Sequence, residues 1–189
     1  MNLPELMEKA RVLLEKRSMG DFEIFGIASD TIRAESKKEE VDFLHRSRES
    51  GISIRILHDG GMGFAYGKDA DDALIEAAAI SARYQYKDAL NRFPEPQGDY
   101  PVISAFDQGI ETLDPDGCIQ RAALLERSAR NADTRVENIR RASFSRSVSE
   151  LRILNSHGIS ASFNVSSVSS SLMVTVRQET DVQSEYDFD

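Results

Sequence analysis

Three histidines and one cysteine are the side chains of this sequence best suited to bind a transition metal. His45, His58 and His157 lie far apart, and no two have the i, i+4 spacing that lets one helix face present two imidazoles to zinc. No HExxH motif occurs, and Cys118 alone cannot form an intrachain disulfide or a zinc site made of several thiolates. The sequence therefore predicts no metal site, no cofactor and no catalytic residue in this chain.

A glycine-rich stretch at 60–63 has the composition of a phosphate-binding loop. It lacks the lysine of a Walker motif, and it leads into a strand pattern rather than into the N-terminus of a helix. Glycine in such a turn usually supplies a positive φ angle for a tight hairpin. We therefore interpret these glycines as turn residues, and we add three residues from two other predicted strand ends. The full set is Gly51, Gly60, Gly61, Gly63, Asn155 and Gly158.

Serines are abundant in the second half of the chain, notably at 166–167 and 169–171. None lies in a GxSxG elbow, and serine at alternate strand positions is typical of a solvated sheet face. The carboxylate pairs Glu39-Glu40 and Asp71-Asp72 lie in charged runs and form no evident general acid and base pair. The sequence thus offers no convergent set of reactive side chains.

Composition excludes several classes of protein. The net charge of −9 and the pI near 4.9 argue against a nucleic-acid binder, which needs clustered lysine and arginine. No stretch reaches the ~20 apolar residues that span a membrane, and the N-terminal residues lack the apolar core of a signal peptide. With 40% hydrophobic residues and one cysteine, the sequence predicts a folded domain in the reducing cytoplasm.

Three helices are predicted by apolar residues at helical spacing. The first extends over 4–18, with a proline at its start and Gly20 after its end. The second extends over 69–84 and has an alanine-rich face, and the third begins at Asp114-Pro115, a typical N-cap followed by a first-turn proline. A long loop over 88–112 separates the second helix from the third.

Alternation of apolar and polar residues predicts strands after the first helix and after the third. The clearest is 51–57, where isoleucines alternate with serine and arginine. The other expected strands are 22–28, 31–35, 41–44, 62–66, 159–165 and 172–176, with the first two separated by a turn at Ser29-Asp30. Segregated helices and strands favour an α+β fold of mostly antiparallel sheets with about three helices. We expect one domain over 1–189, with a possible sub-boundary in the 88–113 loop.

Six segments carry a resemblance to a known family. They are 21–25 (DFEIF), 31–35 (TIRAE), 51–56 (GISIRI), 59–65 (DGGMGFA), 77–81 (AAAIS) and 151–159 (LRILNSHGI). Their order resembles the N-terminal part of the TldD/PmbA family, also described as TldD/TldE, and the last segment resembles the family's NS.G hairpin. Together the segments extend over nearly the whole chain.

The resemblance implies a longer, two-part protein with a β-rich C-terminal domain. In this family the catalytic subunit resembles a zinc metallopeptidase whose HExxxH motif lies in the C-terminal part, so zinc is expected only there or in a partner. The other subunit lacks the motif and pairs with the first, which implies a homodimer or a heterodimer with a family paralogue. Peptides and unfolded proteins are the implied substrates, including peptide-antibiotic precursors and antitoxins, and PmbA-type members are described as modulators of DNA gyrase. We expect residues 182–189 to continue into such a domain.

Two other readings of the sequence remain open. A freestanding protein-interaction module could present the long loop or its strand edges to a partner. A small-molecule enzyme would require a pocket lined by residues such as Asp42, His45 and Arg55. The family-like reading is that of a non-catalytic domain which supports dimerisation and a chamber for peptide substrate.

Overall fold

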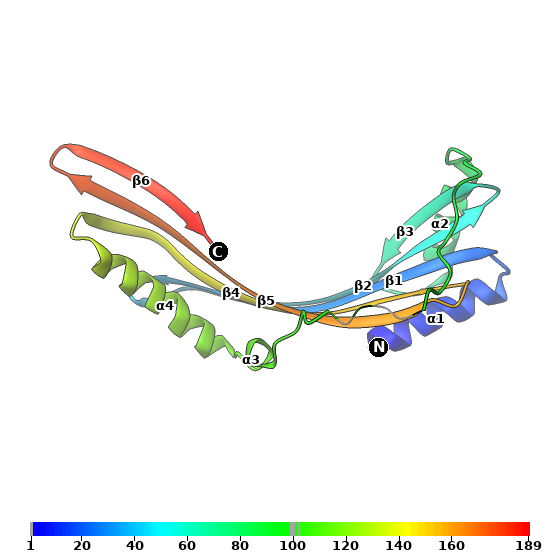
Figure 1. Ribbon diagram of the computed structural model, residues 1–189, viewed down its shortest axis with the longest axis horizontal. Helices are drawn as coiled ribbons and strands as arrows, with labels where there is room; N and C mark the ends of the chain where they lie inside the picture. Colours follow the sequence, from blue (N-terminus) through cyan, green and yellow to red (C-terminus); the bar gives the residue numbers. More distant parts are fainter. Residues whose placement is uncertain (1, 99–100, 102) are drawn as a thin grey trace. The chain divides into compact units, whose positions relative to one another are not determined.

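Ten helices and strands form the part of the chain that the computed structural model describes, which is residues 2–98, 101 and 103–189 (Figure 1). In chain order they are α1 (Leu3–Lys16), β1 (Asp21–Lys37), β2 (Glu40–His58), β3 (Gly61–Gly67), α2 (Asp72–Tyr84), α3 (Gln108–Glu111), α4 (Pro115–Ala132), β4 (Val136–Asn155), β5 (Ser160–Gln178) and β6 (Asp181–Phe188). Among these residues no helix combines the length and apolarity needed to cross a membrane.

The six strands form one sheet in the order β3-β2-β1-β4-β5-β6. The register of β2 with β3 is antiparallel, from Ile52 opposite Gly67 to His58 opposite Gly61. The register of β5 with β6 is antiparallel as well. These observations confirm the expected α+β fold of mostly antiparallel strands. They also confirm about three full-length helices, since α3 is only a single turn.

The chain divides into two compact units, and the long strands contribute to both. Unit 1 comprises Met1–Ala28, Glu49–Ser104 and Ser149–Asn164, and unit 2 comprises Ser29–Arg48, Ala105–Val148 and Val165–Asp189. Each unit has its own apolar cluster, so we describe each unit separately.

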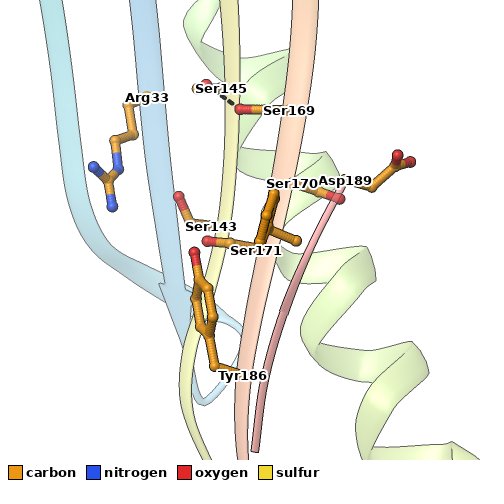
Figure 2. Close-up of a pocket in the computed structure, with 9 residues that line it drawn as sticks. Arg33, Ser143, Ser145, Ser169, Ser170, Ser171, Tyr186 and Asp189 are labelled. Atoms are coloured by element: carbon orange, nitrogen blue, oxygen red, sulfur yellow. Dashed lines mark hydrogen bonds between the residues drawn. The ribbon is translucent and has the colours of Figure 1, made fainter.

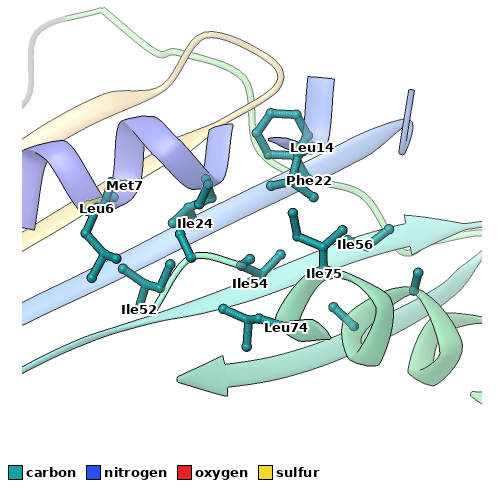
Figure 3. Packing of buried hydrophobic residues seen from close by; sticks show 14 of the residues in the cluster. Leu6, Met7, Leu14, Phe22, Ile24, Ile52, Ile54, Ile56, Leu74 and Ile75 are labelled. Atoms are coloured by element: carbon teal, nitrogen blue, oxygen red, sulfur yellow. The ribbon is translucent and has the colours of Figure 1, made fainter. Parts of the chain in front are cut away.

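Unit 1 has a core in which helices α1 and α2 cover one sheet face (Figure 3). Ile52, Ile54 and Ile56 of β2 point into it, as the alternation in the sequence predicts. Arg17, at the end of α1, ties the two helices together, since its guanidinium lies 2.6 Å from the Asp72 carboxylate. Helix α1 begins with a capping box, in which Glu5 N–H donates to Asn2 Oδ1 over 2.9 Å.

Unit 2 has a smaller core between α4 and the sheet. Ile32 and Ala34 of β1 pack against Cys118 and Ala122 of α4, and all four are fully buried. The helix begins as predicted at Asp114-Pro115, where Asp114 Oδ1 accepts from Gly117 N–H over 2.8 Å. Burial raises the pKa of the Cys118 thiol, with a smaller opposing effect from nearby arginines, as is typical of a buried cysteine in a core.

A buried carboxylate fixes the turn between β1 and β2. Glu126 of α4 is fully buried, and its oxygens accept from Ser36 Oγ at 2.6 Å and from the N–H groups of Lys38 and Glu39 at 2.7 and 2.9 Å. Arg130 donates to the same carboxylate over 3.0 Å. Burial by itself raises the pKa of Glu126, but these hydrogen bonds together outweigh it and hold that pKa below 4.5.

Several predicted strand boundaries are wrong, in each case because the real strand is longer. No turn occurs at Ser29-Asp30, because both residues lie within the continuous strand β1, whose neighbour in the sheet is β4. The side chain of Arg146 in β4 also donates to the Asp30 carbonyl, from Nη1 over 3.0 Å. Likewise 41–44 and 51–57 belong to the single strand β2, and 159–165 and 172–176 to β5. Strand β6 was not predicted at all.

The loop predicted over 88–112 is largely irregular, apart from α3 near its end. Of this loop, residues 99, 100 and 102 lie outside the described part of the chain. Its first part is fixed to unit 1, since Asp88 N–H donates to the Gly60 carbonyl over 3.0 Å.

Candidate functional site

The sheet face of unit 2 that lies opposite α4 carries a hollow lined mostly by polar side chains. Ile32 and Ala34 point toward α4, so Arg33 between them points to the other face. Figure 2 shows Arg33 and the labelled side chains in front of the strands, with α4 behind them. This arrangement gives unit 2 one face packed by a helix and one face that carries polar side chains.

A shallow hollow of about 250 Å³ lies on this face. Its lining comes from β1, β4, β5, β6 and the residue after β6: Arg33, Ser143, Ser145, Ser169, Ser170, Ser171, Tyr186, Phe188 and Asp189. We call it the hydroxyl hollow, because six of these nine lining residues carry a hydroxyl group. Its volume lies just below the range of drug-sized ligand sites, which start near ~300 Å³.

The serines of the hollow come together from strands distant in sequence. Ser145 Oγ of β4 and Ser169 Oγ of β5 lie 2.9 Å apart and share a hydrogen bond. Ser143 is buried, and in Figure 2 the Tyr186 hydroxyl points toward Ser143 and Ser171. Each hydroxyl can donate one hydrogen bond and accept others, so the lining suits a polar ligand with several acceptors.

Arg33 supplies the positive charge of the hollow. Its Nη2 donates to Glu35 Oε1 over 2.7 Å, and 44% of the side chain is exposed. Its Nε is buried and has no hydrogen-bond partner among the described residues. Arg141 lies 3.6 Å from the other oxygen of Glu35, so Arg33 does not neutralise that carboxylate alone. The guanidinium therefore keeps donor capacity for a ligand.

The rim of the hollow is apolar on the β6 side. Tyr186 and Phe188 alternate along β6 and share a face, with their rings stacked at a centroid distance of 6.1 Å. Tyr186 lies opposite Met173 and Phe188 opposite Ser171 in the antiparallel register with β5. Both rings are largely exposed, at 50% and 74%. Aromatic rings beside hydroxyls are a common way to hold a peptide-like ligand.

The hollow carries hydroxyl groups, one guanidinium and the Asp189 carboxylate. Its lining contains no imidazole, so no histidine is placed to take a proton from a serine hydroxyl. It also has no nitrogen or sulfur ligand set for zinc. Across the described residues, no three His, Cys, Asp or Glu side chains gather as a group that could hold a metal ion. The residues present therefore do not fit a resident zinc ion.

The three histidines are placed far from one another in local roles. His45 stacks on Phe43, with ring centroids 6.1 Å apart. His58 Nε2 lies 3.6 Å from the Asp59 carboxylate, and His157 Nε2 lies 3.1 Å from the Asp21 carboxylate. Each of these contacts is the ordinary environment of a surface or hairpin histidine.

Two family models match the chain in sequence order. Residues 22–83 match the model described as PmbA/TldA metallopeptidase domain 1, and residues 109–189 match the PmbA/TldA metallopeptidase central domain. The two matches together include most of the chain. The chain belongs to the PmbA/TldD family. Comparison with curated proteins finds no significant match.

Three solved structures have a similar fold. TldE from Thermococcus kodakarensis matches with a TM-score of 0.81 at 23% identity, over 96% of this chain and 42% of that one. A candidate modulator of a DNA gyrase from Thermotoga maritima matches with a TM-score of 0.82 at 16% identity, over 98% of this chain and 42% of that one. A candidate modulator of DNA gyrase from Bacteroides thetaiotaomicron matches with a TM-score of 0.82 at 21% identity, over 100% of this chain and 45% of that one. The chain thus spans less than half the length of these relatives.

The glycine-rich turn that precedes α2 of this PmbA/TldD chain has two separate functions. Asp59 and Gly60 have φ angles of +47° and +80° and form the two-residue turn between β2 and β3. Gly61 and Gly63 instead lie under α2: a Cβ at Gly63 would be 2.0 Å from the Ala78 carbonyl oxygen. Only glycine lets the helix approach the strand so closely, and nothing here resembles a phosphate cradle.

The family-like hairpin at 155–158 is organised by one buried amide. Asn155 Oδ1 accepts from the N–H groups of His157 and Ile159, at 3.0 and 2.9 Å, and its Nδ2 donates to the Pro94 carbonyl over 2.8 Å. Gly158 has a φ of +96°, which completes the turn. Gly51 lies against Gly67 of β3, since a Cβ added to Gly51 would be 3.0 Å from the Gly67 carbonyl oxygen.

The pocket considered for a small-molecule enzyme is divided between the two units. Arg55 belongs to unit 1, whereas Asp42 and His45 belong to unit 2. Arg55 pairs there with the buried Glu23 carboxylate, and its guanidinium lies over the Phe93 ring at 5.6 Å. Arg55 is thus engaged by structural partners.

The hydroxyl hollow was not found from the sequence. The serines were noticed, but their alternation was interpreted as a solvated face without a ligand. Arg33 lies 110 residues before Ser143, as their numbers show, and only the pairing of β1 with β4 brings them together. The alternation of Val182, Tyr186 and Phe188 was the available signal for β6.

Proposed function

We propose that this chain is the non-catalytic front part of a PmbA/TldD metallopeptidase-related protein, with the hydroxyl hollow facing the space that peptide substrate enters. The observation that carries the proposal is the ordered match to domain 1 and the central domain of this family. The hollow adds a chemical reason, since hydroxyls and one guanidinium recognise a peptide without cleaving it.

In this proposal, hydrolysis takes place outside the chain. A family zinc site would be supplied by a C-terminal part or by a partner subunit, because the donor set described above does not hold zinc. The parent would act as a homodimer or as a heterodimer with a paralogue, in the cytoplasm. Its substrates would be peptides or unfolded proteins, such as peptide-antibiotic precursors or antitoxins.

The decisive experiment is to read the gene beyond codon 189 and to purify its full product. We expect a β-rich domain downstream and a stable dimer by light scattering, either alone or with a co-expressed paralogue. An HExxxH motif in that domain would identify the protein as the catalytic subunit. A complete domain without the motif would identify it as the partner subunit. A full-length product with no such domain would refute the proposal.

A second candidate function, a freestanding protein-interaction module, is favoured by the aromatic edge of unit 1. Phe64 and Tyr66 of the edge strand β3 have their rings 6.0 Å apart and are 52% and 78% exposed. Exposed aromatic side chains of this kind are frequent in protein interfaces. A full-length product that remains monomeric and binds a partner through Phe64 and Tyr66 would support this function over the first.

A further inference from the structure

We propose that the hydroxyl hollow binds a carboxylate of an extended peptide, with Arg33 as the charged contact and the serine and tyrosine hydroxyls as neutral ones. The peptide nature of the ligand rests on the proposed function. The preference for a carboxylate rests on the residues of the hollow alone.

Arg33 is the residue that selects a carboxylate. One of its donors is used by Glu35, whereas its Nε is unpaired among the described residues. A carboxylate can accept from two N–H groups of one guanidinium at once, and such charge-assisted pairs are about twice as strong as neutral hydrogen bonds. An unpaired buried donor is unfavourable, and a ligand oxygen that accepts from Arg33 Nε after a small rotation of the side chain would remove this penalty.

The charges around the hollow favour a monoanion over a phosphate. Arg33 is the only cation in the lining, and the carboxylate of Asp189 lies at its other end. Glu35 lies beside Arg33 as well. Since the whole chain carries a net charge of −9, a doubly charged phosphate would meet more repulsion than one carboxylate.

The shape of the hollow favours an extended segment. Its volume of about 250 Å³ suits one acidic side chain or one chain end rather than a large ligand. The hydroxyls of Ser143 and Ser171 lie beside it, and the Tyr186 and Phe188 rings form an apolar rim for the neighbouring peptide residues. The hollow thus combines an anchor for charge with contacts that do not depend on sequence.

The test is peptide titration of the 189-residue chain, followed through the Arg33 Nε–H signal in nitrogen-15 NMR spectra. One probe is a short acetylated and amidated peptide of glycine, serine and alanine with a central glutamate. The second probe replaces glutamate by glutamine. The third has no acidic side chain but a free C-terminal carboxylate. The first and third distinguish a side-chain carboxylate from a chain end.

We expect the glutamate peptide or the free-carboxylate peptide to bind at least about tenfold more tightly than the glutamine peptide, with the Arg33 signal shifting on binding. R33Q should lose this preference, and R33K should retain only part of it, since lysine cannot form the two-bond contact. Y186F should weaken the binding of all three peptides by similar factors, each smaller than the loss of carboxylate binding in R33Q.

R127Q is the matched control. Arg127 lies on α4, on the other side of the sheet, and pairs with Glu39 at 2.8 Å. Its loss removes the same charge and should leave peptide binding unchanged. Equal binding of the glutamate, free-carboxylate and glutamine peptides would overturn the proposal, as would a folded R33Q or R33K variant with unchanged preference.

These outcomes are separate from those of the proposed function. A carboxylate preference that depends on Arg33 would stand even if the full-length product had no peptidase-like domain. Conversely, a family-like downstream domain together with no carboxylate preference would leave the family role intact and refute the ligand assigned here.

Discussion

At the scale of single residues, Glu126 is the side chain on which unit 2 depends most. Its carboxylate satisfies two backbone donors of the β1–β2 turn, at Lys38 and Glu39, as well as Ser36 Oγ. E126A should lower the free energy of unfolding by about 3 kcal/mol, because the buried Ser36 hydroxyl and the two partly buried N–H groups would lose their charged acceptor. Urea denaturation measures the change.

E137A is the control for this variant. Glu137 pairs with Arg177 at 2.9 Å, and 44% of its side chain is exposed. Such a surface pair contributes less than about 1 kcal/mol, so E137A should be nearly neutral. Equal effects of E126A and E137A would show that the buried contacts of Glu126 do not stabilise the fold.

The same carboxylate gives a dependence of stability on pH. The folded pKa of Glu126 lies below its ordinary value of 4.5, because hydrogen bonds to its charged form outweigh the effect of burial. Its ionised form therefore stabilises the fold above that pH, and this contribution is lost as the pH falls through the folded pKa. The stability difference between the wild type and E126Q should shrink below pH 4.5; a difference that grows on acidification would contradict the assignment.

Gly63 is the second residue whose identity has a measurable effect. A methyl group there would lie 2.0 Å from the Ala78 carbonyl oxygen and 2.4 Å from Ala82 N, both in the backbone of α2. G63A should therefore destabilise the protein by about 2 kcal/mol or more in thermal unfolding. Gly98 has no atom within 4 Å of such a methyl group, so G98A should be neutral or slightly stabilising.

At the scale of elements, the turn between β1 and β2 uses residues that do not favour its backbone. Lys38 and Glu39 both have positive φ angles, 57° and 62°, where asparagine and glycine are preferred. The double variant K38N/E39G should raise the free energy of unfolding by about 1 kcal/mol. The Arg127 pair with Glu39 that it loses is exposed and contributes little. A less stable double variant in urea would contradict this reading of the turn.

The sequence predicted the helices and caps of this fold better than its strands. Capping and helical spacing are local, so Asp114 was identified as an N-cap from its neighbours alone. The lengths of β1, β2 and β5 depend on pairing with strands distant in sequence. The polar residues Ser29 and Asp30 were therefore interpreted as a turn, although β4 keeps them in β1.

The candidate site could not be predicted for a related reason. Its arginine comes from β1, its serines from β4 and β5, and its aromatic rim from β6. Phe163 alternates with serines in the expected strand 159–165, which is typical of a half-buried strand, yet Phe163 is 57% exposed. Alternation indicates which side chains share a face, but it does not indicate which face is covered.

At the scale of the whole molecule, the fold should not require strand β6, whereas the hydroxyl hollow does require it. All eight residues of β6 are exposed, and its only strand neighbour in the described sheet is β5. A chain ending at Thr180 should keep the circular dichroism signature of the sheet and most of its stability. It should bind all three peptide probes more weakly, because Tyr186 and Phe188 would be gone, while Arg33 still favours the carboxylate peptides. A truncated chain that folds and binds the peptides as tightly as the 189-residue chain would place the site elsewhere.

We propose that this PmbA/TldD chain receives peptide but contains no hydrolytic centre. Elemental analysis of the purified 189-residue chain, after equilibration with zinc and dialysis, tests it most directly, with peptide probes incubated in parallel and examined by mass spectrometry. We expect far less than one zinc ion per chain, and peptides that remain intact. Zinc bound tightly at one ion per chain, together with peptide cleavage, would contradict it.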